Sequence, residues 1–175
     1  MDRTHLIEKG ADVNIQDIDG CTALMRACGE GHVDTVRVLI EKGADVNIQD
    51  IDGCTALMRA CGDGHVDTVR VLIEKGADVS IQANNGGTAL MLACGEGHVD
   101  TVRVLIEQGA DVSIKDNDWC TALMRACGGG HVDIVRVLIE TGADVNVQAN
   151  NGGTALTIAH SKGHVEIVGN LLQSM

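Results

Sequence analysis

TALMRACGEGHVDTVRVLIEKGADV, residues 22–46, is the segment from which the architecture of this chain can be worked out. It returns as residues 55–79 with a single replacement, of Glu30 by Asp63. Its closing motif, Gly-Ala-Asp-Val, recurs every 33 residues along the chain, starting at Gly10, Gly43, Gly76, Gly109 and Gly142. A fixed period of this length is the signature of a repeat protein, in which each unit stacks on its neighbour.

The period divides the whole chain into units, and we predict a single repeat array over residues 1–175. Residues 1–16 match the second half of a unit and form a partial N-terminal repeat. Full repeats cover 17–49, 50–82, 83–115 and 116–148, and a shorter C-terminal capping repeat covers 149–175. The division leaves no segment over for a second domain or a linker.

Within one unit the pattern predicts two short helices and a turn. Thr22 is a good N-cap for a first helix with an apolar stripe, and Gly29 and Gly31 end it. A second helix is expected from about Val33 to Lys42, again with one apolar face. Asn-Gly pairs at 85–86 and 151–152 are typical of tight hairpin turns. Helices this short are unstable alone, so the units must stack.

Composition excludes several classes of function. The chain has 175 residues, a net charge of −12, no Pro, Phe or Tyr, and Trp119 as its only aromatic residue. An enzyme of this size normally uses aromatic side chains in its core and substrate pocket, so we expect no enzyme. The negative charge disfavours nucleic acid as a partner. No apolar run reaches the ~18 residues that a membrane span needs, so we expect no membrane role.

The unit resembles the ankyrin repeat, whose family signature is Thr-Pro-Leu-His-x-Ala. The matching residues are Thr22-Ala23-Leu24-Met25-Arg26-Ala27, followed by Gly31-His32-Val33-Asp34 and Gly43-Ala44-Asp45-Val46-Asn47. Ala stands in place of the family's Pro in every unit, and Met or Thr in place of its His. The resemblance implies an all-α repeat solenoid, an ankyrin-like stack of helix-turn-helix units joined by β-hairpin or turn connections. It also implies a scaffold that binds a protein or peptide through a concave groove.

The family's binding positions can be transferred to this chain, and they are also where its copies differ most. They fall on the exposed side of the first helices, at the hairpin tips and at the turns between helices. The first helices supply Arg26, Arg59, Leu92, Arg125 and Ile158; the tips supply Ile18, Asp19, Cys21, Ile51, Asp52, Cys54, Asn84, Asn85, Asn117, Asp118, Trp119, Cys120, Asn150 and Asn151; the turns supply Glu30, Asp63 and Glu96.

The three arginines among these candidates allow two interpretations. Arg26, Arg59 and Arg125 recur at regular spacing, which suits the carboxylates of an extended peptide. Alternatively, each arginine pairs with a neighbouring acidic residue of the chain itself.

Trp119 stands where the other units have Gly, so a turn that requires positive φ would strain it. An exposed Trp is typical of an interface anchor, and a tolerated or introduced replacement is the alternative.

The cysteines fall into two classes: Cys28, Cys61, Cys94 and Cys127 are expected on the buried stripe of the first helices, and Cys21, Cys54 and Cys120 at the more exposed tips. A Gly-His pair recurs once per unit, which argues against a catalytic centre, since such a centre is needed only once. Equivalent residues in stacked units are about 8–10 Å apart, too far for shared zinc coordination or for a ladder of disulfides. We therefore expect no cofactor and no metal, and structural thiols in a reducing, intracellular and cytoplasmic setting. The repeated histidines, such as His32 and His65, are expected to brace neighbouring turns through hydrogen bonds.

The ends of the array suggest a further possibility. His160, Ser161, Lys162, Gly169 and Asn170 give the last unit a more polar, cap-like character. Residues 1–9 supply a second helix without its own first helix, which leaves the N-terminal repeat uncapped. The alternative to a partner-binding scaffold is therefore a structural, engineered or excised array that self-associates end to end through this repeat.

Overall fold

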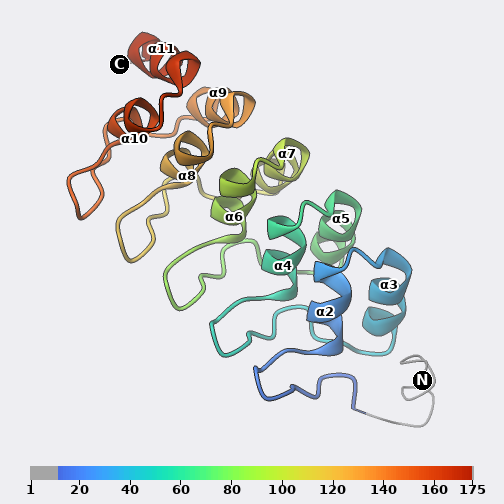
Figure 1. Cartoon of the computed structure of the whole chain (residues 1–175). Helices are drawn as coiled ribbons and strands as arrows, with labels where there is room; N and C mark the ends of the chain where they lie inside the picture. The colour runs from blue at the N-terminus through green and yellow to red at the C-terminus, as the bar shows by residue number, and fades with distance from the viewer. Residues whose placement is uncertain (1–11, 175) are drawn as a thin grey trace.

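The computed structural model describes residues 12–174, which form ten helices in five helix-turn-helix pairs (Figure 1). The pairs are α2 (Ala23–Gly29) with α3 (Val33–Glu41), α4 (Ala56–Gly62) with α5 (Val66–Glu74), α6 (Ala89–Glu96) with α7 (Val99–Glu107), α8 (Ala122–Gly129) with α9 (Val132–Glu140), and α10 (Ala155–Ser161) with α11 (Val165–Ser174). They stack in chain order, which confirms the predicted all-α solenoid.

The ends of the helices follow the local sequence as predicted. The Thr22 hydroxyl accepts a hydrogen bond from the Met25 amide at 3.2 Å, and the equivalent Thr caps the first helix of every other described unit. Gly31 follows that helix with φ +70°, a backbone conformation that glycine adopts without strain. The second helix of this pair ends at Glu41, one residue before the predicted limit.

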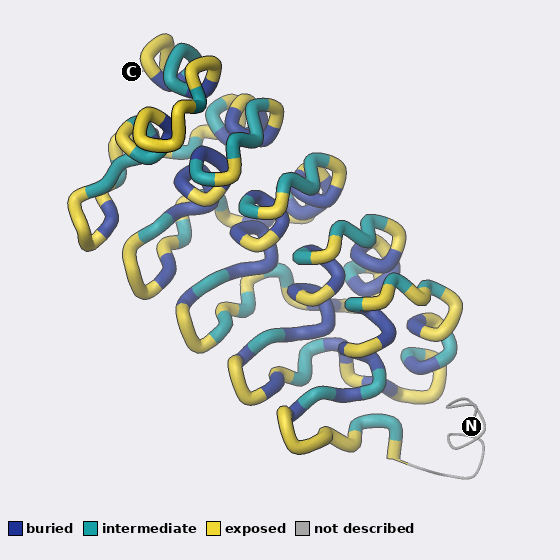
Figure 2. Tube along the Cα trace, in the orientation of Figure 1, coloured by how far each residue is buried: buried dark blue, intermediate teal, exposed yellow. Residues whose placement is uncertain are grey.

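The core is a thin layer between the two rows of helices. Leu24, Met25 and Cys28 from α2 and Val36 and Leu39 from α3 are all nearly inaccessible to solvent. Equivalent positions are buried in the following pairs, so buried segments continue from pair to pair in Figure 2. Each pair therefore stabilises its neighbours, as the short helices require.

The connections between pairs project to one side of the stack and end in tight turns (Figure 1). In the second unit the Asp50 amide donates to the Cys54 carbonyl at 3.0 Å, and the Gly53 amide donates to the Asp50 carbonyl at 2.9 Å. Within residues 12–174 the β pairing is limited to one isolated bridge, between Gln82 and Thr88. The predicted hairpins are thus turns, because each is too short to form a ladder.

Histidines brace neighbouring units, as expected. Nε2 of His65, His98 and His131 lies 2.9–3.0 Å from the carbonyl oxygen of Gly29, Gly62 and Gly95, respectively, in the preceding unit. These contacts link the turns of successive pairs on the side opposite the tips. They give the histidines of the second, third and fourth units a structural role.

The C-terminal unit only partly matches the polar cap that was expected. His160, Ser161 and Lys162 are exposed, but Val165 is 81% and Leu172 58% exposed on α11. The equivalent Val132 and Ile139 of α9 are half-buried, because α11 packs beside them. The second helix predicted for residues 1–9 lies outside the described residues.

Candidate functional site

The candidate residues fall on two adjoining rows. The inner row consists of Arg26, Arg59, Leu92, Arg125 and Ile158, one from each of α2, α4, α6, α8 and α10. The tip row consists of residues 17–21, 50–54, 83–87, 116–120 and 149–153, which form the turns that precede those helices. All inner-row side chains are exposed except Ile158, which is half-buried. Because the units stack in register, both rows run along the array.

Each inner-row arginine is paired with an aspartate of its own tip. Arg59 Nη2 lies 2.6 Å from Asp50 Oδ2, Arg125 Nη2 lies 2.5 Å from Asp116 Oδ2, and Arg26 bonds Asp17. The carboxylates of Asp50 and Asp116 are only 1% and 2% exposed. These pairs correspond to the second interpretation of the arginines, since their charge is matched within the unit.

The pairing also shifts the ionisation of its members. The hydrogen bond from Arg26 is the main reason that the pKa of Asp17 lies below its ordinary value. The hydrogen bond to Asp50 likewise raises the pKa of Arg59. Both shifts favour the charged forms, so the pairs persist at neutral pH.

The aspartates of these pairs were not among the predicted site residues, although the sequence carries a signal for them. Where the inner row has Leu92 or Ile158 in place of arginine, the tip has Ala83 or Ala149 in place of aspartate. The two positions change together across the units, as expected for residues in contact. The other oxygen of Asp50 accepts hydrogen bonds from the amides of Asp52 and Cys54 at 3.0 and 2.8 Å, which shapes the turn.

Most asparagine side chains of the tips form hydrogen bonds within the array. Nδ2 of Asn84, Asn117 and Asn150 donates to the carbonyl of the preceding tip, at Ile51, Asn84 and Asn117, over 2.8–3.0 Å. In the third unit Asn85 Oδ1 accepts from the Gly87 amide at 2.9 Å and takes over the role of the turn aspartate. In the fifth unit Asn151 does the same for Gly153. These groups hold the tips in register.

Other tip residues leave their side chains exposed. Ile18 is 94% exposed and Ile51 is 63% exposed, and each is followed by an exposed aspartate, Asp19 or Asp52. Asp118 occupies the same place in the fourth unit. Among the ion pairs of residues 12–174, none includes these three carboxylates. The tip row therefore presents apolar groups next to unmatched negative charge.

Trp119 combines backbone strain with exposure. It has φ +62° and is the one non-glycine residue with positive φ in the described part of the chain. Its side chain is 53% exposed, and Lys115 Nζ lies 4.6 Å from the centre of its ring. The expected strain is thus confirmed, and the ring carries a cation on one face.

The turns between helices add further acidic groups. Glu30, Asp63 and Glu96 are exposed, and Glu30 lies 3.1 Å from His32 Nε2. The fourth unit has Gly129 at this place and the fifth has Lys162. The acidic character of these turns is therefore concentrated in the first three units.

The cysteines form two groups, as predicted, and all seven are free thiols. Cys28, Cys61, Cys94 and Cys127 are buried in the first helices, and burial raises the pKa of Cys28 and of Cys127 to about 12. Cys21, Cys54 and Cys120 lie half-buried at the tips. Between residues 12 and 174 no group of three or more His, Cys, Asp or Glu is arranged to hold a metal ion.

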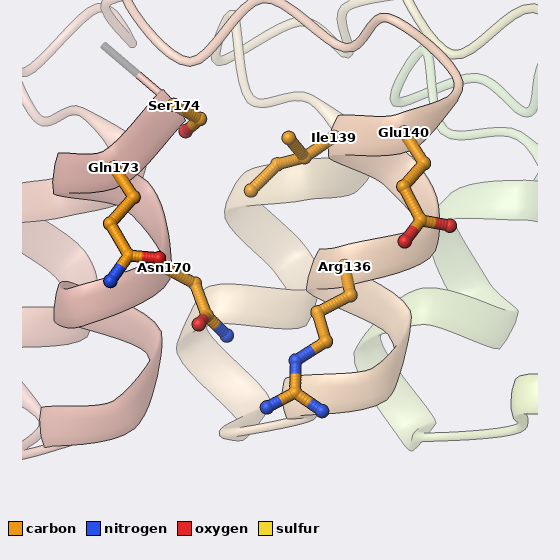
Figure 3. A pocket seen from close by; sticks show the side chains of 6 residues that line it. All are labelled: Arg136, Ile139, Glu140, Asn170, Gln173 and Ser174. Carbon is orange, nitrogen blue, oxygen red and sulfur yellow. The ribbon is translucent and has the colours of Figure 1, made fainter.

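A shallow pocket of about 230 Å³ lies between α9 and α11, away from both rows (Figure 3). Its walls are Arg136, Ile139, Glu140, Asn170, Gln173 and Ser174. Arg136 is held by Glu166 at 2.6 Å. The pocket brings together none of the predicted site residues and contains no nucleophile paired with a base.

Comparison with known proteins identifies the repeat. The family model described as ankyrin repeats (3 copies) matches residues 4–83, 42–116, 78–149 and 113–175, which together cover almost the whole chain. The chain is also 56% identical over 36 residues to a probable E3 ubiquitin-protein ligase, XBOS33, of Oryza sativa subsp. japonica. That match covers 21% of this chain and only 7% of the rice protein. Within residues 12–174, no helix is both long and apolar enough to traverse a bilayer.

Proposed function

The chain belongs to the ankyrin-repeat family, whose repeats generally mediate protein–protein interaction, and we propose that it binds a protein or peptide through the inner row and the tip row. In this role it acts as a scaffold without catalysis. The brief similarity to a ubiquitin ligase lies within a small part of that protein, so it supports the repeat and not the ligase activity.

This proposal rests on the positions at which the repeat units differ in sequence. Unit 83–115 departs from unit 50–82 at eight positions, which are 83, 84, 85, 87, 92, 96, 108 and 115. The first six lie in the tip row, the inner row or the turn between the helices. The buried residues of the first helix, such as Leu57 and Cys61, return unchanged as Leu90 and Cys94. Variation concentrated on one surface, above a constant core, is the pattern expected of an interaction surface.

Selection from a random peptide library, followed by binding to two variants, tests the proposal. The surface variant combines Leu92→Arg with Trp119→Ala, and the control combines Arg70→Ala with Arg103→Ala on the exposed side of α5 and α7. Arginine is already present at the equivalent inner-row positions, so Leu92→Arg is compatible with the fold. We expect the selected peptides to lose about tenfold or more in affinity for the surface variant and little for the control.

Two results would contradict the proposal. The first is a set of peptides that lose affinity for the control as much as for the surface variant, since that would place binding on the outer helices. The second is no enrichment above background with the folded chain. Circular dichroism of both variants establishes that they remain helical.

End-to-end association is the second candidate, and the exposed apolar residues of α11 favour it. Val165 and Leu172 lie where a following helix pair would cover them in the rest of the array. Sedimentation velocity over a wide concentration range tests the idea. A variant with Leu172→Lys should stay monomeric if association uses this end, and a concentration-independent monomer of the unaltered chain would exclude association.

A further inference from the structure

We propose that the partner of the tip row is an extended, basic segment with Lys or Arg at every third residue. Each basic side chain lays its methylene stem on Ile18, Ile51 or Trp119 and places its charge against Asp19, Asp52 or Asp118. This inference rests on the proposed function and specifies the chemistry of the partner. It replaces the earlier interpretation in which arginines of this chain bind carboxylates of the partner.

The charge on the two rows supports a basic partner. The guanidinium groups of Arg26, Arg59 and Arg125 are matched by carboxylates within their own units, so they offer little net charge to a partner. The carboxylates of Asp19, Asp52 and Asp118 lie outside every ion pair found among residues 12–174. A surface with unmatched carboxylates attracts cations and repels acidic segments.

The pairing of apolar and acidic residues supports long basic side chains in particular. An exposed isoleucine directly precedes the carboxylate at two tips, as Ile18-Asp19 and Ile51-Asp52. Lysine and arginine have an apolar stem and a charged end, and they cover apolar surface while the charge remains in contact with water or an anion. A short cation would contact only the aspartate, and an apolar side chain would contact only the isoleucine.

Trp119 supplies independent support, because a cation already lies on its ring. Lys115 Nζ is 4.6 Å from the centre of that ring. The other units have Gln and Gly at these two places, and in the third unit Gln82 Nε2 donates to the Gly86 carbonyl at 2.8 Å. Both residues are replaced together in the fourth unit, where Asp118 is the adjacent carboxylate. The fourth tip is therefore built to hold a cation, and a partner arginine would compete with Lys115 for the ring or stack on its free face.

The spacing of the units fits a segment with a period of three. Packed helices lie about 8–10 Å apart, which sets the distance between equivalent residues of neighbouring units. A polyproline II segment rises about 3.1 Å per residue with three residues per turn, so its equivalent side chains recur about every 9 Å on one face. A basic residue at every third position can thus meet the first, second and fourth tips, and the one between them faces Asn84 and Asn85 of the third tip, which carries no carboxylate at this place.

The test uses a fluorescein-labelled peptide in which Arg-Pro-Leu is repeated five times, and a matched peptide with Glu in place of Arg. Binding to the full chain is measured by fluorescence anisotropy, and the emission of Trp119, the only tryptophan, reports contact at the fourth tip. The tip variant carries Asp19→Asn, Asp52→Asn and Asp118→Asn. Asparagine already occupies this place as Asn85 and Asn151, so the fold should tolerate it.

A control variant removes the same number of charges elsewhere. Glu41→Gln, Glu74→Gln and Glu107→Gln change exposed residues at the ends of α3, α5 and α7 and leave the net charge equal to that of the tip variant. We expect saturable binding of the arginine peptide, weakened about tenfold by the tip variant and less than about twofold by the control. The emission of Trp119 should change when the peptide binds. The replacement Lys115→Gln should strengthen peptide binding, because it removes the cation that competes for the ring.

Three outcomes would overturn the inference. Equal losses in the two triple variants would show attraction by net charge without a docking site. Stronger binding of the glutamate peptide would show the opposite preference. No saturable binding of the arginine peptide would exclude this partner. Library peptides of other chemistry that depend on Leu92 and Trp119 would then leave the proposed function intact, so the two failures are distinguishable.

Discussion

At the scale of single residues, Trp119 carries a conformation that glycine provides at the equivalent places. Gly20, Gly53, Gly86 and Gly152 have φ between +74° and +79°, and Trp119 has φ +62°. A left-handed conformation costs a residue with a side chain about 1–2 kcal/mol. A costly conformation kept at an exposed tip is consistent with a contact made there to a partner.

Two replacements of Trp119 separate the backbone strain at this position from the contact that its ring makes with a partner. We expect Trp119→Gly to raise the free energy of unfolding by up to about 1 kcal/mol, because glycine adopts positive φ without strain. Trp119→Ala keeps the strain and should be less stable than Trp119→Gly. Urea unfolding measures both. Both variants should bind a cognate peptide more weakly, and an unchanged dissociation constant would show that the ring is not an anchor.

Thr101 places a hydroxyl group in the core, where it lowers the stability of the fold. Among the residues that the structure describes, the hydroxyls of Thr68 and Thr101 are buried without a hydrogen-bond partner. Ile134 and Ile167 occupy the same place in the next two units and are 1% and 0% exposed. A buried polar group without a partner destabilises a fold by about 1–3 kcal/mol, so the core favours isoleucine here.

The replacement Thr101→Ile should therefore raise the free energy of unfolding by about 1–2 kcal/mol. Thr101→Val removes the hydroxyl and keeps the shape of the side chain. It therefore separates the effect of losing the hydroxyl from the effect of the larger apolar side chain of isoleucine. Thr35→Ile is the matched control, because Thr35 is exposed, and it should change stability by less than about 0.5 kcal/mol. Thermal or urea unfolding measures all three, and a destabilised Thr101→Val variant would show that the hydroxyl has a partner in solution.

At the scale of the elements, one side chain after each second helix decides how firmly its turn is joined to the next unit. Asn47 Nδ2 donates to the Gly76 carbonyl at 3.2 Å, and its Oδ1 accepts from the Asp78 amide at 2.9 Å. Asn14 makes the same two bonds to Gly43 and Asp45. Ser80 and Ser113 instead bond Asp78 and Asp111 within their own units.

Restoring asparagine should strengthen a junction between units. In Ser80→Asn, the amide can reach the Gly109 carbonyl and the Asp111 amide, as Asn47 reaches the equivalent groups. We expect the free energy of unfolding to rise by about 1 kcal/mol, since two exposed hydrogen bonds replace one. Ser80→Ala, which removes the existing bond and adds none, should be no more stable than the unaltered chain. Urea unfolding of the three proteins would show whether the added bonds form.

The elements also show what the sequence can and cannot predict. Thr22, Gly31 and the apolar stripes predict both helices of a unit to within a residue, because capping and helical periodicity are local. The contact between Arg26 and Asp17 spans nine residues and a turn, so no local rule identifies it. Only comparison among units does so, through the joint change of Asp and Arg to Ala and Leu at positions 83 and 92. The tip hydrogen bonds of Asn84 and Asn117 depend on the stacking distance, which the sequence does not specify.

At the scale of the whole molecule, the array should behave as a chain of nearest neighbours. Contacts that join units, such as those of His65 and Asn47, reach only the adjacent unit. Units 17–49 and 50–82 differ only at Glu30/Asp63 and Asn47/Ser80. The surface that unit 17–49 would present to unit 83–115 is therefore almost the one that unit 50–82 now presents. Asn47 would even supply the junction bonds that Ser80 lacks.

Removal of residues 50–82 should consequently give a shorter protein that still folds. We expect the free energy of unfolding to fall by about 2–5 kcal/mol, because one unit and one interface are lost. The slope of the free energy of unfolding against urea concentration should fall in proportion to the surface that the shorter protein no longer buries. Removal of residues 50–65 is the control: it deletes a tip and α4 and joins Gln49 directly to α5, so the apolar stripe of α5 loses its partner helix. If that half-unit deletion were as stable as the whole-unit deletion, stacking in register would not be what holds the array together.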